Sequence, residues 1–312
     1  MAVLMNKIVI TTGDPNGIGA EITIKALNKL NTDASKISII SNRNILNYYG
    51  RLNKDYEIIE IPYSSEIKAG EITKEAGEFS YLSLKRACEI RPSAIVTAPV
   101  AKHALYLAGH KYSGQTEILQ KYLAKDGQSA EMLFVAGNFR VLLLTRHLPL
   151  KEIKLTKDEV KEKIINLNKF FAERFNIQNP KFALCGFNPH AGEDGILGRE
   201  EIDVLIPAVE ELRENGIDIT KPLPADTLFS KIRKNGDNWI ADYDCYIANY
   251  HDQGLIPIKA LAGSKTVNMT MGLDIIRTSP GHGTAFDIAG KNIADETSMI
   301  EALKEAMKFT FN

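Results

Sequence analysis

Short apolar runs alternate with amphipathic helical segments along most of this chain. The first run, Lys7–Thr12, ends in a turn rich in Gly and Pro, and apolar residues at helical spacing follow over Ile18–Leu30. This alternation predicts an α/β fold with parallel strands. Further strands are expected at Lys36–Ser41, Glu57–Ile61, Ser93–Thr97, Lys181–Cys185 and Asp244–Tyr250, and further helices at Arg43–Leu52, Thr73–Ile90, Thr156–Phe175 and Glu200–Asn215.

Two local signals refine this pattern. The segments Ala130–Ala136 and Phe139–Thr145 flank the pair Gly137-Asn138, which is typical of a β-hairpin turn. Thr156, with Glu159 three residues later, has the spacing of a helix capping box.

Composition excludes several classes of protein. With 312 residues, 44% hydrophobic and 25% charged, the chain resembles a soluble globular protein of one large or two ordinary domains. A net charge of −1 argues against nucleic acid or an anionic membrane as partner. Three scattered cysteines without a CxxC pair argue against a disulfide framework or a thiolate zinc site. No secretory signal or membrane span is visible, so we expect a cytoplasmic protein.

The turn after the first run, Gly13–Gly17, occupies the position of a dinucleotide-binding loop. Ile22 stands where the third glycine of that fingerprint would be, so the fingerprint is absent. A tight turn is the favoured interpretation, and Asp14 remains a functional candidate.

Histidines follow three of the predicted strands. His147, His190 and His251 each come soon after an apolar run, where the loops of α/β sheets carry function. Three imidazoles leave an open position on a divalent metal, as catalytic sites require. Structural histidines are the alternative.

The stretch Asn249–Asp287 is interrupted repeatedly by Gly and Pro, which is typical of active-site loops. Its cations Lys259 and Arg277 could hold an anionic substrate. Upstream of it, Asp226 could be a base or a helix cap.

Eight motifs occur in order along nearly the whole chain, and the ordered set is far more specific than any one of them. Together they resemble the 4-hydroxythreonine-4-phosphate dehydrogenase family, NAD-dependent enzymes of pyridoxal 5′-phosphate synthesis. The motifs are GDPNGIGAE (13–21), TAPVAK (97–102), GQTE (114–117), TRHLPL (145–150), FNPHAGE (187–193), PADTLF (224–229), YHDQG (250–254) and RTSPGHGTAFDIAG (277–290).

The resemblance implies an isocitrate/isopropylmalate dehydrogenase-like α/β fold of two domains, with the active site in the interdomain cleft. Residues 1–125 plus 272–312 would form the first domain, which carries the cofactor loop. Residues 126–271 would form the second, which carries the metal ligands and the dimer contacts. The resemblance also implies a homodimer with its site at the interface, where His147 and His190 come from one chain and His251 from its partner.

The resemblance assigns roles to single residues. His147, His190 and His251 would bind one divalent metal, with zinc favoured and magnesium or cobalt as alternatives. NAD or NADP would bind at His282, Gly283, Thr284 and Asp287. Asp226 and Lys259 are the catalytic candidates, and nothing in the sequence decides which of them is the base. The substrate would be held by Gln115, Thr116, Lys259, Asn268 and Arg277.

The implied reaction oxidises 4-phosphooxy-L-threonine to 2-amino-3-oxo-4-(phosphooxy)butanoate, which loses CO₂ to give 3-amino-2-oxopropyl phosphate. Two positions depart from the family: Gln115 replaces a usual histidine, and Gly281 replaces a usual acidic residue. A related dehydrogenase of threonate or erythronate 4-phosphate is therefore a second interpretation. A metal-dependent hydrolase or acyltransferase on the same scaffold is the third.

Overall fold

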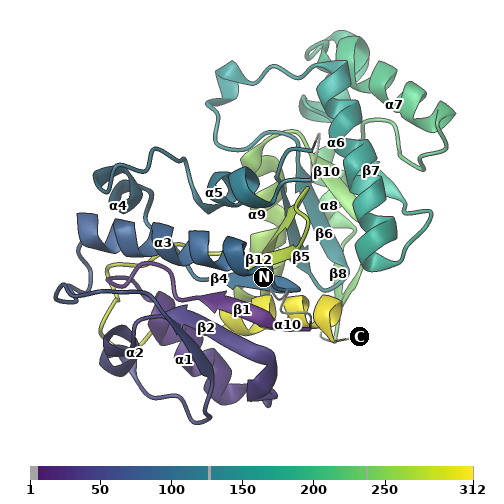
Figure 1. The fold of residues 1–312 in the computed structure, drawn as a ribbon. Coiled ribbons are helices and arrows are strands. Elements are labelled where there is room, and N and C mark those ends of the chain that lie inside the picture. Colours follow the sequence, from purple (N-terminus) through teal and green to yellow (C-terminus); the bar gives the residue numbers. More distant parts are fainter. Residues whose placement is uncertain (1–5, 126–127, 237, 312) are drawn as a thin grey trace. The chain divides into compact units, whose positions relative to one another are not determined.

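The computed structural model describes residues 6–125, 128–236 and 238–311 (Figure 1). The chain divides into two compact units: unit 1, Met1–Ala130 with Val267–Asn312, and unit 2, Glu131–Thr266. The boundaries of the two expected domains differ from this division by a few residues.

Unit 1 is built on strands in the order β3-β2-β1-β4-β12-β11. All neighbours are parallel except β11, which runs antiparallel to β12. The parallel pairs confirm the expected α/β architecture. The strands are β1 (Ile8–Thr11), β2 (Ile37–Ser41), β3 (Glu57–Glu60), β4 (Ala94–Thr97), β11 (Val267–Met271) and β12 (Ile276–Pro280).

Helices bury the two faces of these strands in separate cores. Ile8 and Ile10 of β1 belong to one core, with residues of α1 and α10, and Val9 belongs to the other, with residues of α3 and α5. This alternation follows from the two-residue period of a strand. The helices of unit 1 are α1 (Gly19–Lys29), α2 (Arg43–Tyr49), α3 (Lys74–Ile90), α4 (Lys102–Leu107), α5 (Gln115–Leu123) and α10 (Thr297–Thr310).

Unit 2 has strands in the order β5-β6-β10-β7. The antiparallel pair β5 (Glu131–Ala136) and β6 (Phe139–Leu143) confirms the predicted hairpin, with Ala136 opposite Phe139. β10 (Cys245–Ala248) lies between β6 and β7 (Phe182–Leu184) and is parallel to both.

The helices of unit 2 begin with α6 (Lys157–Phe170), which starts in the predicted Thr156–Glu159 capping box. The chain continues from α6 as a π-helical turn over Phe171–Phe175. Unit 2 also contains a π-helical turn at Glu201–Leu205, α7 (Ile206–Glu214), α8 (Ala225–Ser230), the hairpin β8 (Arg233–Asn235) and β9 (Asn238–Ile240), and α9 (His251–Ala262).

Helix α9 corrects one expectation. The segment after His251 was expected to form loops, because Gly254 and Pro257 interrupt it, yet residues 251–262 are helical. A Cβ built on Gly254 would lie 2.6 Å from a methyl carbon of Leu143, so this glycine lets the helix pack directly on the strands. Gly254 therefore serves helix packing here and does not break the helix.

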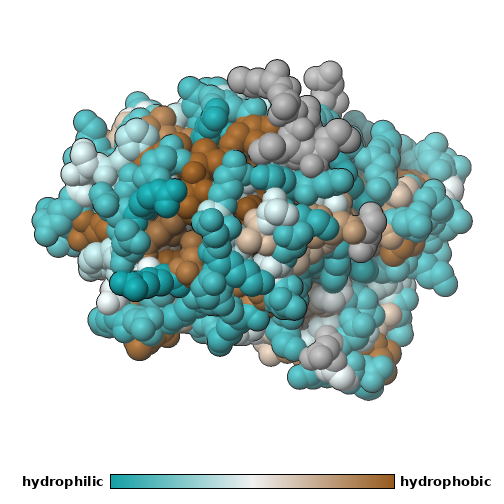
Figure 2. Space-filling model, turned by 60° about the horizontal axis from the view of Figure 1, so that its bottom comes forward, coloured by the Kyte–Doolittle hydropathy of each residue, from teal (hydrophilic) through white to brown (hydrophobic). Residues whose placement is uncertain are grey.

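Apolar side chains gather in patches framed by polar residues on the face shown in Figure 2. In the part of the chain that the structure describes, no helix is both long enough and apolar enough to cross a bilayer.

Candidate active site

The three predicted histidine ligands follow three neighbouring strands of unit 2. His147 follows β6, His251 follows β10 and His190 follows β7, and these strands are parallel and adjacent. Because parallel strands end at the same edge of a sheet, their carboxyl ends bring these three segments to one edge.

Two of the histidines lie side by side. The ring centroids of His147 and His251 are 5.4 Å apart, and the rings are tilted by 46°. Zinc binds imidazole nitrogen at about 2.0–2.1 Å, so two rings at this separation can present nitrogens to one ion. The pair therefore fits a divalent metal.

A carboxylate orients one of these rings. Nδ1 of His251 lies 2.7 Å from Oδ1 of Asp252, which leaves Nε2 to face a ligand. Metal-binding histidines usually donate their second ring N–H to such a partner. Asp252 was not among the predicted site residues, although its place next to His251 in the Y-H-D-Q-G motif was a usable signal.

His190 lies on a strained loop. Five consecutive residues, 190–194, have positive φ, and four of them are not glycine. A left-handed conformation costs roughly 1–2 kcal/mol for each such residue. Among the described residues, no third His, Cys, Asp or Glu completes a metal-binding group with His147 and His251. The close pair within one chain thus differs from the implied grouping of His147 with His190.

A buried glutamate holds this loop. Glu201 is 2% exposed, and its carboxylate accepts hydrogen bonds from the backbone N of Asn188 at 2.7 Å and from its Nδ2 at 2.9 Å. A Cβ on Gly192 would lie 2.7 Å from Glu201 Oε2, so the backbone packs directly on the carboxylate. Glu201 was not predicted from the sequence, and no sequence pattern links it to His190.

Unit 1 contains a buried cation among the predicted substrate residues. Arg277 on β12 is 2% exposed. Nε and Nη2 donate to Thr97 Oγ1 at 3.1 and 2.7 Å, and Nη1 donates to Thr270 Oγ1 at 3.1 Å. Burial lowers the pKa of Arg277 to about 10. A guanidinium held in this way is suited to bind an anion.

Two of the predicted substrate residues have buried amide oxygens that lack partners. Gln115 begins α5 and donates from Nε2 to Ala98 O at 3.0 Å, which orients its amide and leaves the buried Oε1 unpartnered. Oδ1 of Asn268, on β11, is also buried and unpartnered. Ala98 follows Thr97, the partner of Arg277, so Gln115 and Arg277 hydrogen-bond to consecutive residues. Thr116, next along α5, is half-buried.

The predicted cofactor loop of unit 1 is open to solvent. His282, Gly283 and Asp287 are exposed, and Thr284 is half-buried. A Cβ built on Gly283 would meet no atom within 4 Å, so there is room for a ligand beside this backbone. The loop therefore fits a cofactor that lies over it.

The two catalytic candidates are both exposed. Asp226 lies in the first turn of α8, but the helix has Pro224 as N-cap and no side-chain cap bond, so Asp226 is not the cap. Lys259 lies on α9, eight residues after His251, which is about 12 Å along the helix axis at 1.5 Å per residue.

Asp14 is buried directly after β1. Its Oδ1 accepts from the backbone N of Asn16 at 3.0 Å, and its Oδ2 has no partner. Burial raises the pKa of Asp14 to about 6, although the backbone N–H groups of Asn16 and Ala101 oppose that shift.

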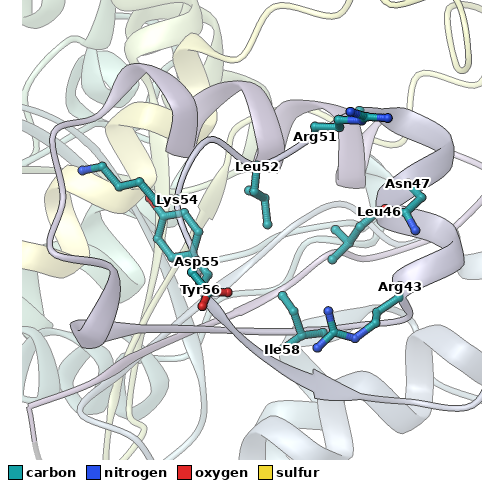
Figure 3. A pocket seen from close by; sticks show the side chains of 10 residues that line it. Arg43, Leu46, Asn47, Arg51, Leu52, Lys54, Asp55, Tyr56 and Ile58 are labelled. Carbon is teal, nitrogen blue, oxygen red and sulfur yellow. The ribbon is translucent and has the colours of Figure 1, made fainter.

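A cavity of about 620 Å³ opens between α2, β3 and the loop that joins them (Figure 3). Two of its cations have partners: Arg43 Nε lies 3.6 Å from Glu60, and Lys54 donates to Thr32 O at 2.6 Å. None of the predicted site residues lines this cavity.

Comparison with known proteins assigns the chain to a family. Residues 5–306 match the family described as pyridoxal phosphate biosynthetic protein PdxA. The chain belongs to this family. The 4-hydroxythreonine-4-phosphate dehydrogenase of Sulfurihydrogenibium sp. (strain YO3AOP1) is 40% identical over 327 residues, covering 97% of this chain and 98% of that protein. The D-threonate 4-phosphate dehydrogenase of Cupriavidus necator is 38% identical over 325 residues, covering 96% of this chain and 95% of that protein.

Solved structures agree with the fold. The 4-hydroxythreonine-4-phosphate dehydrogenase of Klebsiella pneumoniae is similar with a TM-score of 0.84 and 34% identity, over 98% of this chain and 99% of that chain. Isocitrate dehydrogenase from Methylococcus capsulatus matches with a TM-score of 0.53 and 16% identity, over 97% of this chain and 85% of that chain, which shows the fold alone. The expected isocitrate dehydrogenase-like fold is thus confirmed.

Membership in the PdxA family makes the chain a dehydrogenase, and it sets aside the hydrolase and acyltransferase alternatives. Its relatives at similar identity are named for two different phosphorylated substrates.

Proposed function

We propose that this PdxA-family enzyme oxidises the C3 hydroxyl of 4-phosphooxy-L-threonine with NAD or NADP. The product, 2-amino-3-oxo-4-(phosphooxy)butanoate, loses CO₂ to give 3-amino-2-oxopropyl phosphate. The observation that carries the proposal is Arg277, a buried guanidinium held by two threonine hydroxyls and suited to a phosphate or carboxylate.

Buried acceptors without partners on two of the predicted substrate residues favour an amino-acid substrate. Gln115 Oε1 and Asn268 Oδ1 are buried without partners, and leaving a buried acceptor unpaired costs about 1–3 kcal/mol. A substrate ammonium brings three N–H donors, whereas the hydroxyl at the same carbon of a threonate brings one. We therefore favour 4-phosphooxy-L-threonine over D-threonate 4-phosphate.

D-Threonate 4-phosphate is the second candidate, because a relative named for that substrate is 38% identical over nearly the whole chain. Erythronate 4-phosphate is a related possibility.

The residues of this chain would have the following roles. Arg277 and Lys259 would hold the anionic groups, Gln115 and Asn268 would orient the substrate, and Asp226 or Lys259 would take the hydroxyl proton. When bound, NAD or NADP supplies the hydride acceptor, and a divalent ion supplies positive charge that lowers the pKa of the C3 hydroxyl.

His147, His190 and His251 would hold that ion, and the adjacent rings of His147 and His251 support the assignment. Neutral imidazoles suit zinc, and magnesium or cobalt remain alternatives. The loop of His282, Gly283, Thr284 and Asp287 would hold NAD or NADP, which its open surface supports.

We also propose a homodimer with its site at the interface. Large apolar side chains are exposed on the segments that carry the three histidines, which is unfavourable unless another surface covers them. They are Leu148 and Leu150 after His147, Ile196 and Leu197 after His190, and Ile256 after His251.

The deciding experiment is an NADH absorbance assay with zinc-loaded protein. It compares 4-phosphooxy-L-threonine with D-threonate 4-phosphate and D-erythronate 4-phosphate, each with NAD and with NADP. The highest kcat/KM is expected for 4-phosphooxy-L-threonine. A higher kcat/KM for D-threonate 4-phosphate would assign the enzyme to that substrate, and reduction of neither cofactor with any of the three would overturn the proposal.

A further inference from the structure

The turn after β1 contains a fully buried asparagine, Asn16, whose side-chain amide forms three hydrogen bonds. Nδ2 of Asn16 donates to Glu71 O at 3.1 Å and to Thr73 Oγ1 at 3.2 Å, and Oδ1 accepts from Lys68 N at 2.9 Å. The backbone O of Asn16 also accepts from Gly70 N at 2.8 Å. One residue thus fastens the segment 68–73 to the turn.

The two segments that Asn16 joins both contact the predicted cofactor loop. Ile18 N donates to Thr284 O at 3.1 Å, and a Cβ on Gly17 would lie 3.0 Å from the same oxygen. A Cβ on Gly70, whose φ is +89°, would lie 2.9 Å from Phe286 O. Neither glycine can carry a side chain without moving the loop, so the loop rests on both segments through close backbone contacts.

We propose that Asn16 is a positioning residue for the nicotinamide cofactor, acting through the loop that contains Thr284 and Asp287. This inference rests on the proposed function, in which that loop binds NAD or NADP. Asn16 keeps the turn and the segment 68–73, which contact Thr284 and Phe286, in fixed positions relative to each other. The loop is therefore ordered before the cofactor binds. Binding then requires less ordering of the protein, which raises affinity.

The substitution Asn16→Asp tests this with little change in shape. Aspartate keeps an acceptor for Lys68 N, but it has no N–H for Glu71 O or Thr73 Oγ1. It also places a carboxylate oxygen against the carbonyl of Glu71. The fastening of segment 68–73 should therefore loosen.

Asn28 offers a matched control. Its Nδ2 donates to Arg51 O at 2.8 Å, its Oδ1 accepts from Asn53 N at 2.9 Å, and its backbone O accepts from Asn53 Nδ2 at 3.1 Å. Asn28→Asp removes the same kind of bond in the same unit, but from a bridge between α1 and residues 51–53.

The experiment measures NADH and NADPH binding to the whole protein by calorimetry, together with steady-state kinetics. Asn16→Asp is expected to raise the cofactor Kd and KM about tenfold, a size of effect in the range expected when buried hydrogen bonds are lost. The KM for the phosphorylated substrate should stay within about threefold of the wild-type value, because Arg277 is held by Thr97. Asn28→Asp should leave all three constants unchanged.

Gly70→Ala provides a second route if Asn16→Asp does not fold, because its methyl group disturbs the loop at Phe286 with Asn16 intact. It should produce the same selective loss of cofactor affinity. The inference would be overturned if a folded Asn16→Asp variant binds the cofactor with wild-type affinity. If Asn16→Asp is unfolded, wild-type cofactor affinity in Gly70→Ala would overturn it. So would an equal loss in Asn28→Asp. If wild type itself binds neither cofactor, the proposed function fails and this inference fails with it.

Discussion

The guanidinium of Arg277 donates two hydrogen bonds to a single hydroxyl, that of Thr97 on the neighbouring parallel strand. This arrangement fixes the plane of the guanidinium before any ligand binds. Lysine carries a charge but cannot reproduce two bonds from a planar group. The planar geometry of the Arg277 guanidinium should therefore matter for anion binding as much as its charge.

Arg277→Lys is expected to lower kcat/KM for the phosphorylated substrate at least about 30-fold, which corresponds to about 2 kcal/mol of lost anion binding. Arg277→Ala should lower it further. Arg91→Ala is the control, because Arg91 pairs with Asp274 on the exposed surface of unit 1. Wild-type kinetics in Arg277→Lys would show that the arginine has only a structural role.

Gln115→His is expected to retain activity within about fivefold. A neutral imidazole can donate to Ala98 O from one nitrogen and offer the other as an acceptor, as the Gln115 amide does. The measurement is kcat/KM for both phosphorylated substrates. A folded but inactive variant would show that the surroundings are specific for glutamine.

Asp252→Asn is expected to weaken zinc or cobalt binding about 10- to 100-fold, because the His251 ring loses its carboxylate partner. Competition with a chelator measures the affinity without turnover. Asp203→Asn, which disturbs the exposed pair of Asp203 with Arg199, is the control. Equal affinity in Asp252→Asn and wild type would remove Asp252 from the metal site.

Asp14→Asn should change how stability depends on pH. The folded-state pKa of Asp14, about 6, lies above the ordinary aspartate value of 3.8, so between these values the folded state binds more protons than the unfolded state. The free energy of unfolding of wild type should therefore fall as pH rises through this window, by up to about 3 kcal/mol.

The variant should lack that fall and gain stability relative to wild type above pH 6, as measured by urea unfolding at fixed pH values. Asp33→Asn is the opposite control, since Ser35 lowers the pKa of Asp33 and its contribution is lost as pH falls. Parallel pH profiles for wild type and Asp14→Asn would contradict the assignment.

Mixing inactive variants tests how dimers would share the metal site. Because His147 and His251 of one chain lie together, we expect His190 to come from the partner. Refolding His147→Ala with His190→Ala should then restore about a quarter of the sites, since half of the dimers are mixed and each has one intact site. His147→Ala mixed with His251→Ala should stay inactive. Recovery of activity by this second mixture would instead support the grouping implied by the family resemblance, in which His147 and His190 come from one chain.

Much of this architecture was predictable because strand ends carry local signals. Each of the three histidines follows an apolar run, and the hairpin at residues 137–138 and the cap at Thr156 depend only on nearby residues. Helix α9 was not predictable, because the space that Gly254 provides is defined by Leu143, more than a hundred residues earlier. Glu201 was not predicted for a related reason. No regular spacing in the sequence links a loop to the carboxylate that holds it.

The parallel order of β6, β10 and β7 has a consequence for redesign. Neighbouring strands lie about 4.8 Å apart whatever their side chains, because backbone hydrogen bonds set the distance. The spacing of the segments that carry His147 and His251 is therefore set by the main chain. Carboxylates or thiolates could replace the imidazoles one at a time, and the choice of ion would change while the scaffold kept its dimensions.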